Sequence, residues 1–426
     1  MKKVLIISYF YPPANFVGAQ RTAAWAKYLH EYGYYPIIIT RQWNEGQTDL
    51  VDKVKNNKLE IEKNNTHEVH RLPYKYSLRD RLANYPALKV FQKALTLKEL
   101  VLSNYSIKQL PFSNFYAYSK NLIQKDSEIN IVIASGRPFQ AFFIGYQLKR
   151  DFPRIHWVPD YRDEWTSHQT PQSLSYTHRL MSKTEQKKEK EWTSNISFFI
   201  SVSKNWTENI AITIEKEGVT VLNGFSNDVP KYISEISDRK VLNIGYLGSA
   251  YPTQNFKVLL SAVKELVNTT NFNFSLNFYG SKPKDILIFE SNLGGENKER
   301  IKINFFERTD RNNLIQKVKS IDILYLTELE NNKGWLPVKV FDYYNSDKPI
   351  LLCPSDNDLM ENFIKETNSG YIANTVEECT AILEELIQLK KEGKPLIGPR
   401  NEENALFYSR KYQTKVLAGY LDSLFE

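Results

Sequence analysis

Short apolar runs alternate with amphipathic helical patterns along the first half of the chain. The apolar run at residues 4–7 predicts a buried strand at 4–8, and residues 20–32 repeat apolar positions at helical spacing until an expected helix end near Gly33. Because strands that alternate with helices pair in parallel, this pattern predicts a parallel sheet covered on both faces. The other strands expected in this half are 36–40, 129–134, 156–160 and 197–202. Residues 183–191 are expected to form an exposed helix of mixed charge.

The same alternation starts again after a polar, turn-forming segment at 223–227. A length of 426 residues suits two domains better than one core. We therefore expect two α/β domains with Rossmann-like parallel sheets, residues 1–225 and 226–404. A helix at 405–426 follows them and is a candidate to cross back to the first domain. The strands expected in the second half are 242–247, 274–279, 301–305, 322–326 and 349–352.

Two turns, one in each half, follow a predicted buried strand and open a helix. They are residues 8–21 and residues 334–344. In open parallel sheets, ligands bind beyond the carboxyl ends of the strands. We therefore expect the two domains to face each other across a cleft that holds a ligand.

The turn at Pro337 has the residues of an anion site. The helix expected to begin after it offers free backbone N–H groups and the positive end of its dipole, which suit phosphate oxygens. Lys339 adds a cation in the first turn, and Asp342, about one turn later, can accept hydrogen bonds from two vicinal hydroxyls, as on a ribose. The alternative is that Asp342 is only a favourable charge near a helix start and that Lys339 is solvated.

Two segments of the first half carry further chemistry. Gly18 follows a Pro-Pro turn and allows close approach of a ligand to the backbone, and Arg21 could face phosphates or an acceptor. Residues 160–165 place three carboxylates and an arginine at a strand end, and so much charge requires pairing. We expect Arg162 to pair with Asp160, and Asp163 to face a reacting sugar. Paired carboxylates also occur in glycoside hydrolases, but the phosphate-binding features disfavour that class.

The net charge of +7 is concentrated in one segment. Residues 71–108 contain eight basic and two acidic residues, interleaved with apolar ones. Such a segment can bind an anionic membrane surface; the alternative is a solvated helical face that packs on its own domain. No nucleic-acid recognition module is present, so we expect no nucleic-acid partner. Two cysteines, and no segment resembling a signal peptide or a membrane span, favour a cytoplasmic protein, with the inner membrane face as a candidate location.

Taken together, these motifs resemble the GT-B glycosyltransferases of the family 4 type. The resemblance covers nearly the whole chain, in the right order. The stretches that carry it are 8–18, 134–139, 160–166, 221–224, 245–249 and 336–350.

The resemblance implies transfer of a sugar from a nucleotide diphosphate sugar to a glycan or lipid-linked acceptor, with retention, without a metal and with no cofactor beyond the donor. The expected setting is surface polysaccharide or glycolipid synthesis. By the resemblance Gly18 and Ala19 face the donor phosphates, Lys339 and Pro337 lie near the diphosphate, and Asp342 holds the ribose. Arg308, with its neighbours Phe306 and Glu307, flanks the base, while Gly136 and Arg137 lie on the acceptor side.

The chain departs from the family pattern at two donor-binding positions. In the family pattern, seven residues separate a first glutamate from the second acidic residue, here Asp342, and the position of that first glutamate is Gly334 in this chain. The usual arginine after Gly248 is Ser249. Two alternatives stay open, and the departures favour the second of them. One is a nucleotide-sugar epimerase of the same fold, and the other is a catalytically degenerate subunit that binds a nucleotide sugar or glycan.

Overall fold

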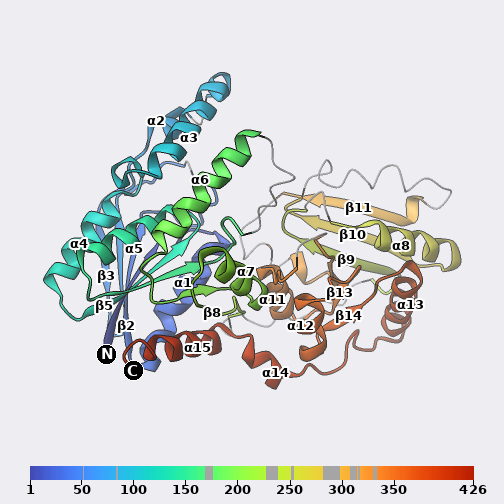
Figure 1. Ribbon diagram of the computed structural model, residues 1–426. Helices are drawn as coiled ribbons and strands as arrows, with labels where there is room; N and C mark the ends of the chain where they lie inside the picture. The colour runs from blue at the N-terminus through green and yellow to red at the C-terminus, as the bar shows by residue number, and fades with distance from the viewer. Residues whose placement is uncertain are drawn as a thin grey trace. The chain divides into compact units, whose positions relative to one another are not determined.

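The computed structural model describes residues 1–50, 52–82, 85–167, 176–226, 238–250, 254–281, 298–307, 314, 317–329 and 333–426. Within them the chain divides into two compact units (Figure 1). The first contains Met1–Asn223 and Arg410–Glu426, and the second contains Gly224–Ser409. The parallel α/β character predicted from the sequence is confirmed in both units.

The first unit is built on an eight-stranded sheet in the order β3-β4-β2-β1-β5-β6-β7-β8. All neighbouring strands are parallel except β3 and β4. Chain order reverses between β1 and β5, which makes their carboxyl ends the switch point where ligands usually bind. The strands are β1 Lys2–Ser8, β2 Tyr34–Arg41, β3 Glu60–Lys63, β4 Glu68–Leu72, β5 Ile129–Gly136, β6 His156–Tyr161, β7 Phe199–Ser201 and β8 Gly218–Thr220.

Helices cover both faces of this sheet. Trp25 of α1 and Leu417 of α15 join the core on the face that carries Val4 and Ile6. On the other face, α5 approaches so closely that a Cβ on Gly145 would lie 2.3 Å from the Trp157 ring. The helices of this unit are α1 Val17–Tyr28, η1 Leu29–Tyr32, α2 Leu78–Leu82, η2 Pro86–Leu88, α3 Lys89–Ser103, η3 Ile107–Gln109, α4 Asn114–Lys125, α5 Gln140–Asp151, α6 Tyr176–Trp192, α7 Lys204–Ile214 and α15 Arg410–Asp422.

The second unit has a six-stranded parallel sheet in the order β11-β10-β9-β12-β13-β14. Its switch point lies between β9 and β12. The strands are β9 Val241–Leu247, β10 Asn273–Tyr279, β11 Ile301–Phe306, β12 Ile323–Leu326, β13 Ile350–Leu352 and β14 Gly370–Ile372. The helices are α8 Lys257–Thr269, η6 Lys298–Arg300, α11 Val338–Asn345, α12 Leu359–Thr367, α13 Val376–Glu392 and α14 Glu402–Phe407.

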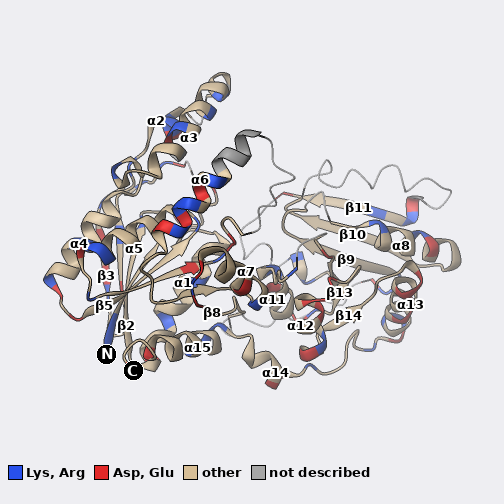
Figure 2. Ribbon diagram, in the orientation of Figure 1, with Lys and Arg blue, Asp and Glu red and all other residues tan. Residues whose placement is uncertain are grey.

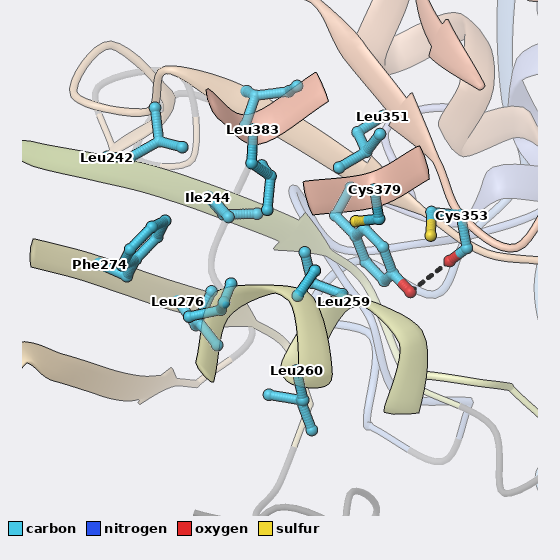
Figure 3. Close-up of a cluster of buried hydrophobic side chains, with 14 of the residues drawn as sticks. Leu242, Ile244, Leu259, Leu260, Phe274, Leu276, Leu351, Cys353, Cys379 and Leu383 are labelled. Atoms are coloured by element: carbon cyan, nitrogen blue, oxygen red, sulfur yellow. Dashed lines mark hydrogen bonds between the residues drawn. The ribbon is translucent and has the colours of Figure 1, made fainter. Parts of the chain in front are cut away.

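The core of the second unit lies between the sheet and helices α8 and α13. Figure 3 shows its aliphatic side chains, such as Ile244 and Leu383, together with Cys353 and Cys379. Both cysteines are free and fully buried, so they behave here as small apolar residues. The hydroxyl of Tyr325 donates to the carbonyl of Cys353, which gives this buried tyrosine a polar partner.

The final helix differs from the single helix expected at 405–426. It is divided into α14 and α15, with a break at Tyr408 and Ser409. At this break the carbonyl of Tyr408 accepts a hydrogen bond from the backbone N–H of Phe225 at 3.1 Å. Helix α15 itself belongs to the first unit and packs against α1.

Candidate functional site

In the second unit, the carboxyl end of β9 and the start of α11 meet at the switch point of the sheet. The backbone N–H of Leu247, the last residue of β9, donates to the Tyr343 hydroxyl of α11 at 2.8 Å. Helix α11 begins directly after Pro337, whose ψ of 144° is extended. As at any helix N-terminus, the first backbone N–H groups have no partner within the helix and can bind an anion.

Lys339 is held at this corner by one polar contact. The residue is half-buried, its Nζ donates to the Tyr246 hydroxyl at 2.7 Å, and a Cβ on Gly248 would lie 3.6 Å from the same Nζ. Burial lowers the pKa of Lys339 to about 7. An amine with this pKa changes charge near neutrality, and an anion beside it would favour the charged form.

The other residues predicted for this corner are placed as follows. Asp342 is half-buried and follows Lys339 by about one turn on α11. Ser249 is exposed after β9, in a loop held by Ser281, whose Oγ donates to the Gly248 carbonyl at 2.7 Å. Gly334 has φ 73°, a left-handed conformation that favours glycine. Arg308 lies outside the described residues.

Two tyrosines of this corner were not singled out from the sequence. The Tyr246 hydroxyl accepts a hydrogen bond from Lys339 Nζ and donates one to Gln254 Oε1 at 2.8 Å, while Tyr343 connects α11 to β9. Both lie in apolar stretches, where tyrosine is an ordinary core residue. No sequence signal distinguishes such a tyrosine, because its role depends on which strand and helix come together.

In the first unit, Arg162 brings several of the predicted residues together. Its Nε donates to the Gly136 carbonyl at 2.7 Å, and its Nη2 donates to the carbonyl of Arg137. Its Nη1 lies against Gly18, where a Cβ would be only 1.6 Å away. Asp163 faces the side chain of Arg137 at 3.6 Å, with both side chains more than half exposed.

Arg21 and Ala19 are buried beside this cluster rather than exposed in it. Arg21 Nε donates to Asp160 Oδ1 at 3.0 Å and its Nη1 donates to the Leu222 carbonyl at 3.0 Å. Burial lowers the pKa of Arg21, and Asp160 opposes that shift. Its Nη2 is buried with no hydrogen-bond partner among the described residues. Ala19 is 1% exposed, so any ligand contact there would involve its backbone.

The expected pairing of Arg162 with Asp160 is therefore wrong. The Asp160 carboxylate is bound by Arg21 and by Ser135 Oγ, the latter at 2.7 Å. Register explains the choice, since Ser135 on β5 lies directly beside Asp160 on β6. Arg162 comes after β6 has ended and extends its side chain to the carbonyls that follow β5.

The helix at 183–191 was expected to be exposed, but one of its charged side chains is buried. Glu189 of α6 is fully buried and accepts a hydrogen bond from the Thr166 hydroxyl. Burial raises the pKa of Glu189 to about 7. Charge alternation along the segment predicted a solvated face, but the sequence contains no sign of which glutamate packs behind residues 160–166.

No protein-family model matches the chain, and no curated protein shows significant sequence similarity to it. Solved structures do match over the full length. A sucrose-phosphate synthase from Thermosynechococcus elongatus has 14% identity and a TM-score of 0.64, covering 100% of this chain and 99% of that one.

Two further solved structures also match this chain over nearly its full length. Anabaena HepE in complex with UDP has 11% identity and a TM-score of 0.56, covering 99% of this chain and 100% of that one. A trehalose 6-phosphate synthase from Burkholderia multivorans has 9% identity and a TM-score of 0.56, covering 100% and 99%. The chain has the GT-B fold. The predicted fold class is thereby confirmed.

In this GT-B chain, each unit contributes its own group of candidate residues. Within the described residues, no group of three or more His, Cys, Asp or Glu side chains is arranged to hold a metal ion. Over the same residues, no helix is both long enough and apolar enough to cross a membrane.

The contact between Gly18 and Arg162 leads to a first prediction. Gly18→Ala places a methyl group where the Arg162 guanidinium lies. We expect the free energy of unfolding to fall by about 1–2 kcal/mol, as is typical of overpacking. In an Arg162→Ala background, where the guanidinium is absent, adding Gly18→Ala should cost little further stability. Thermal and denaturant unfolding measure both effects.

Gly419→Ala is the matched control, because Gly419 is also helical, lies in the same unit, and has open space around its Cβ position. This control should be neutral or slightly stabilising. Equal stability of Gly18→Ala and Gly419→Ala would show that Arg162 does not lie against Gly18.

Proposed function

We propose that the protein is a glycosyltransferase that transfers a sugar from a nucleotide diphosphate sugar to a glycan or lipid-linked acceptor. The reaction proceeds with retention and without a metal, in the synthesis of a surface polysaccharide or glycolipid. One observation carries the proposal. Lys339, with its pKa lowered to about 7, lies in the first turn of α11 at the switch point of the second sheet. That combination is suited to a diphosphate.

The chemistry follows from the charge that develops on the leaving group. Breaking the bond between sugar and diphosphate leaves negative charge on the departing phosphate oxygens. Lys339 and the N-terminal amides of α11 are fixed close together and would stabilise that charge without rearrangement. The Tyr246 hydroxyl holds the amine in position at 2.7 Å, so little entropy is lost when a ligand binds.

The solved GT-B structures support a nucleotide sugar as donor. Anabaena HepE was solved in complex with UDP, and also with UDP and glucose. A trehalose-phosphate synthase from Burkholderia xenovorans is described as UDP-forming. We propose a nucleotide diphosphate sugar for this chain, with Asp342 holding the ribose hydroxyls and Ser249 and Gly334 contributing backbone near the donor.

The first unit would serve the acceptor. Gly136 and Arg137 form the acceptor side, and Asp163 faces the reacting sugar. Arg162 is bound to both carbonyls of the acceptor-side pair and lies against Gly18, so it positions these segments relative to one another. Gly18 and Ala19 would present backbone to the donor phosphates.

The function is tested in two steps. Thermal-shift screening against UDP, GDP, ADP and their sugars should identify one nucleotide family that raises the unfolding temperature, because a ligand that binds the folded state stabilises it. The stabilising sugar nucleotide is then incubated with lipid-linked and glycan acceptors, and release of the nucleotide diphosphate is followed. Stabilisation by none of these nucleotides would contradict the proposal.

Asp342 provides a prediction that separates ribose from phosphate recognition. Asp342→Ala should weaken binding of the nucleotide sugar about tenfold, the effect of losing hydrogen bonds to a charged acceptor. Binding of inorganic pyrophosphate should stay unchanged, because it has no ribose. Calorimetry with both ligands makes the comparison, and equal losses for the two would assign Asp342 a structural role in α11 instead.

A catalytically degenerate nucleotide-sugar-binding subunit is the second candidate, and Gly334 favours it. Its φ of 73° is unfavourable for a residue with a side chain, so a glutamate could not simply be restored there. Exposed Ser249 likewise brings no positive charge to the β9 loop. Tight binding of the donor with no turnover against any acceptor would support this candidate over the transferase.

A further inference from the structure

Helix α3 presents an apolar stripe to solvent. Val90, Ala94, Leu97 and Val101 are spaced four, three and four residues apart, which places them on one face of the helix. All four are exposed, and the exposed fractions of Val90, Leu97 and Val101 are 83%, 51% and 45%. Apolar side chains that pack on their own domain would be buried, so the alternative stated for this segment does not account for the stripe.

Lysines border the stripe on both sides. At about 100° per residue, Lys93 lies roughly 70° to one side of the centre of the stripe and Lys98 roughly 70° to the other. Both are exposed, and Lys89 extends the basic border at the start of the helix. Long lysine side chains in this arrangement can keep their charges in water while the stripe enters an apolar phase.

The acidic residues of this region are turned away from the stripe. Glu99 lies on the opposite face of α3 and pairs with Arg79 of α2 at 3.4 Å. Asp80 is buried and pairs with Arg79 at 2.7 Å. In the part of 71–108 that the structure describes, the stripe therefore has only basic charges beside it.

The position of α3 leaves this face accessible within its own unit. The helix packs against α2 and the short turn η3. Figure 1 shows α2 and α3 projecting beyond the sheet of the first unit, and Figure 2 shows basic positions along both helices. Fifteen residues make a helix of about 22 Å, too short to span a bilayer but suitable for lying in its interface.

We propose that the α3 stripe docks the protein on an anionic lipid bilayer. The apolar residues enter the boundary between head groups and acyl chains, and the flanking lysines contact anionic head groups. A neutral bilayer offers no partner for the lysines, and an acidic protein surface offers no apolar phase for the stripe. This inference does not depend on the proposed transferase activity, because it concerns a different surface of the first unit.

Flotation of the full-length protein with vesicles tests the proposal. The protein should bind vesicles of mixed phosphatidylglycerol and phosphatidylcholine, and should bind pure phosphatidylcholine much less. Raising the salt concentration should weaken binding, because the lysine contribution is screened. Lys93→Gln with Lys98→Gln should lower the partition constant by about tenfold or more, as expected for two basic residues near an anionic surface.

A second variant removes the apolar component. Val90→Ser, Leu97→Ser and Val101→Ser together should lower the partition constant by at least tenfold while leaving the unfolding temperature close to that of the wild type, since all three side chains are exposed. Matched controls are Ile212→Ser, whose side chain is 78% exposed on α7, and the pair Lys204→Gln with Lys415→Gln. These controls should bind vesicles as the wild type does.

The outcomes distinguish the possible occupants of the stripe. Loss of vesicle binding in both α3 variants, with the controls unchanged, supports the proposal. Absence of binding to anionic vesicles overturns it, as does binding that neither α3 variant affects. Self-association that only the apolar variant abolishes, without vesicle binding, would make the stripe an interface between copies of the chain. Nucleotide binding by the α3 variants, measured by calorimetry, should equal that of the wild type, whether or not these variants bind vesicles.

Discussion

Replacing Lys339 with methionine is expected to weaken binding of the nucleotide diphosphate sugar by roughly 10- to 150-fold. The loss corresponds to about 1.5–3 kcal/mol, the range for a hydrogen bond that involves a charged group. Methionine keeps most of the side-chain volume, so packing around Tyr246 and Gly248 should change little. Calorimetry gives the affinity of both proteins under identical conditions.

The pKa of Lys339 makes this prediction sharper. Its pKa is about 7 in the free protein, so at pH 8 the amine is mostly neutral. A bound diphosphate favours the charged amine, and binding at pH 8 should therefore take up close to one proton, whereas binding at pH 6 should take up almost none. Calorimetry in buffers of different ionisation enthalpy measures the uptake. The diphosphate of a nucleotide sugar stays ionised over this range and does not interfere.

The lowered pKa of Lys339 also makes the stability of the protein depend on pH. Between pH 7 and its ordinary value of 10.5, the unfolded chain holds the proton on Lys339 and the folded chain does not. Stability contributed by this group therefore rises with pH across that window, while affinity for the diphosphate falls. Both pH dependences should disappear in Lys339→Met.

Lys240→Met is the matched control for this experiment. Lys240 is exposed in the same unit and immediately precedes β9, at the amino end of the strand whose carboxyl end carries the site. We expect this variant to bind the donor with wild-type affinity and wild-type proton uptake. If Lys339→Met also bound the donor with wild-type affinity and proton uptake, Lys339 would not contact the diphosphate, and the second unit would have to bind the diphosphate elsewhere.

Breaking the ion pair between Arg21 and Asp160 should have the largest effect on stability. Their side chains are 4% and 0% exposed, and Asp160→Ala would leave the Arg21 guanidinium buried without its counterion. Removing one partner of such a pair costs about 3–5 kcal/mol. Tryptophan fluorescence during denaturation reports mainly on this unit, because six of the seven tryptophans, all but Trp335, belong to it.

A double variant separates the structural role of Arg21 from the contact with phosphates or an acceptor that was predicted for it. Arg21→Met with Asp160→Leu replaces both charges with apolar groups and should recover most of the stability lost in Asp160→Ala. Arg21 Nη2 has no hydrogen-bond partner among the described residues. If this group contacts the donor or acceptor, the double variant should be stably folded but should lack transferase activity. A stable and fully active double variant would assign Arg21 to structure alone.

An exposed ion pair of the same unit is the control for these changes. Lys204 and Glu208 lie one turn apart on α7 with side chains 83% and 62% exposed. Glu208→Ala should change stability by less than about 0.5 kcal/mol, because solvent screens such pairs. If Glu208→Ala and Asp160→Ala lowered the free energy of unfolding by similar amounts, Arg21 and Asp160 would not form the buried ion pair described here.

Much of the fold follows from local patterns in the sequence. The strands at 242–247 and 274–279 were predicted to within one residue of β9 and β10, because apolar residues that alternate with polar or small ones are a strong local signal for a strand. Strands β3, β4, β8 and β14 were missed. β3 is exposed along its whole length, and the apolar positions of β4 are interrupted by charged and polar residues. β8 and β14 are only partly buried, whereas the equally short β7 and β13 are fully buried, lie in mainly apolar runs and were predicted.

The candidate site was predictable only in part. Lys339 and Pro337 could be placed because a helix start after a strand is a local feature of the sequence. Tyr246, the partner of Lys339, comes from 93 residues earlier in the chain. Its hydroxyl meets the amine only because β9 and β12 are neighbours in the sheet, and α11 follows β12.

The amino-acid sequence by itself determined the alternation of strands and helices, the turns at the strand ends, and the concentration of basic charge at 71–108. These features depend on residues close together in the chain, where periodicity and turn chemistry act. Only the tertiary structure decided that Arg21 rather than Arg162 binds Asp160, that Lys339 is buried enough to lower its pKa, and that the apolar stripe of α3 is exposed. Each of these depends on sheet register or on burial by distant segments, which local sequence patterns do not encode.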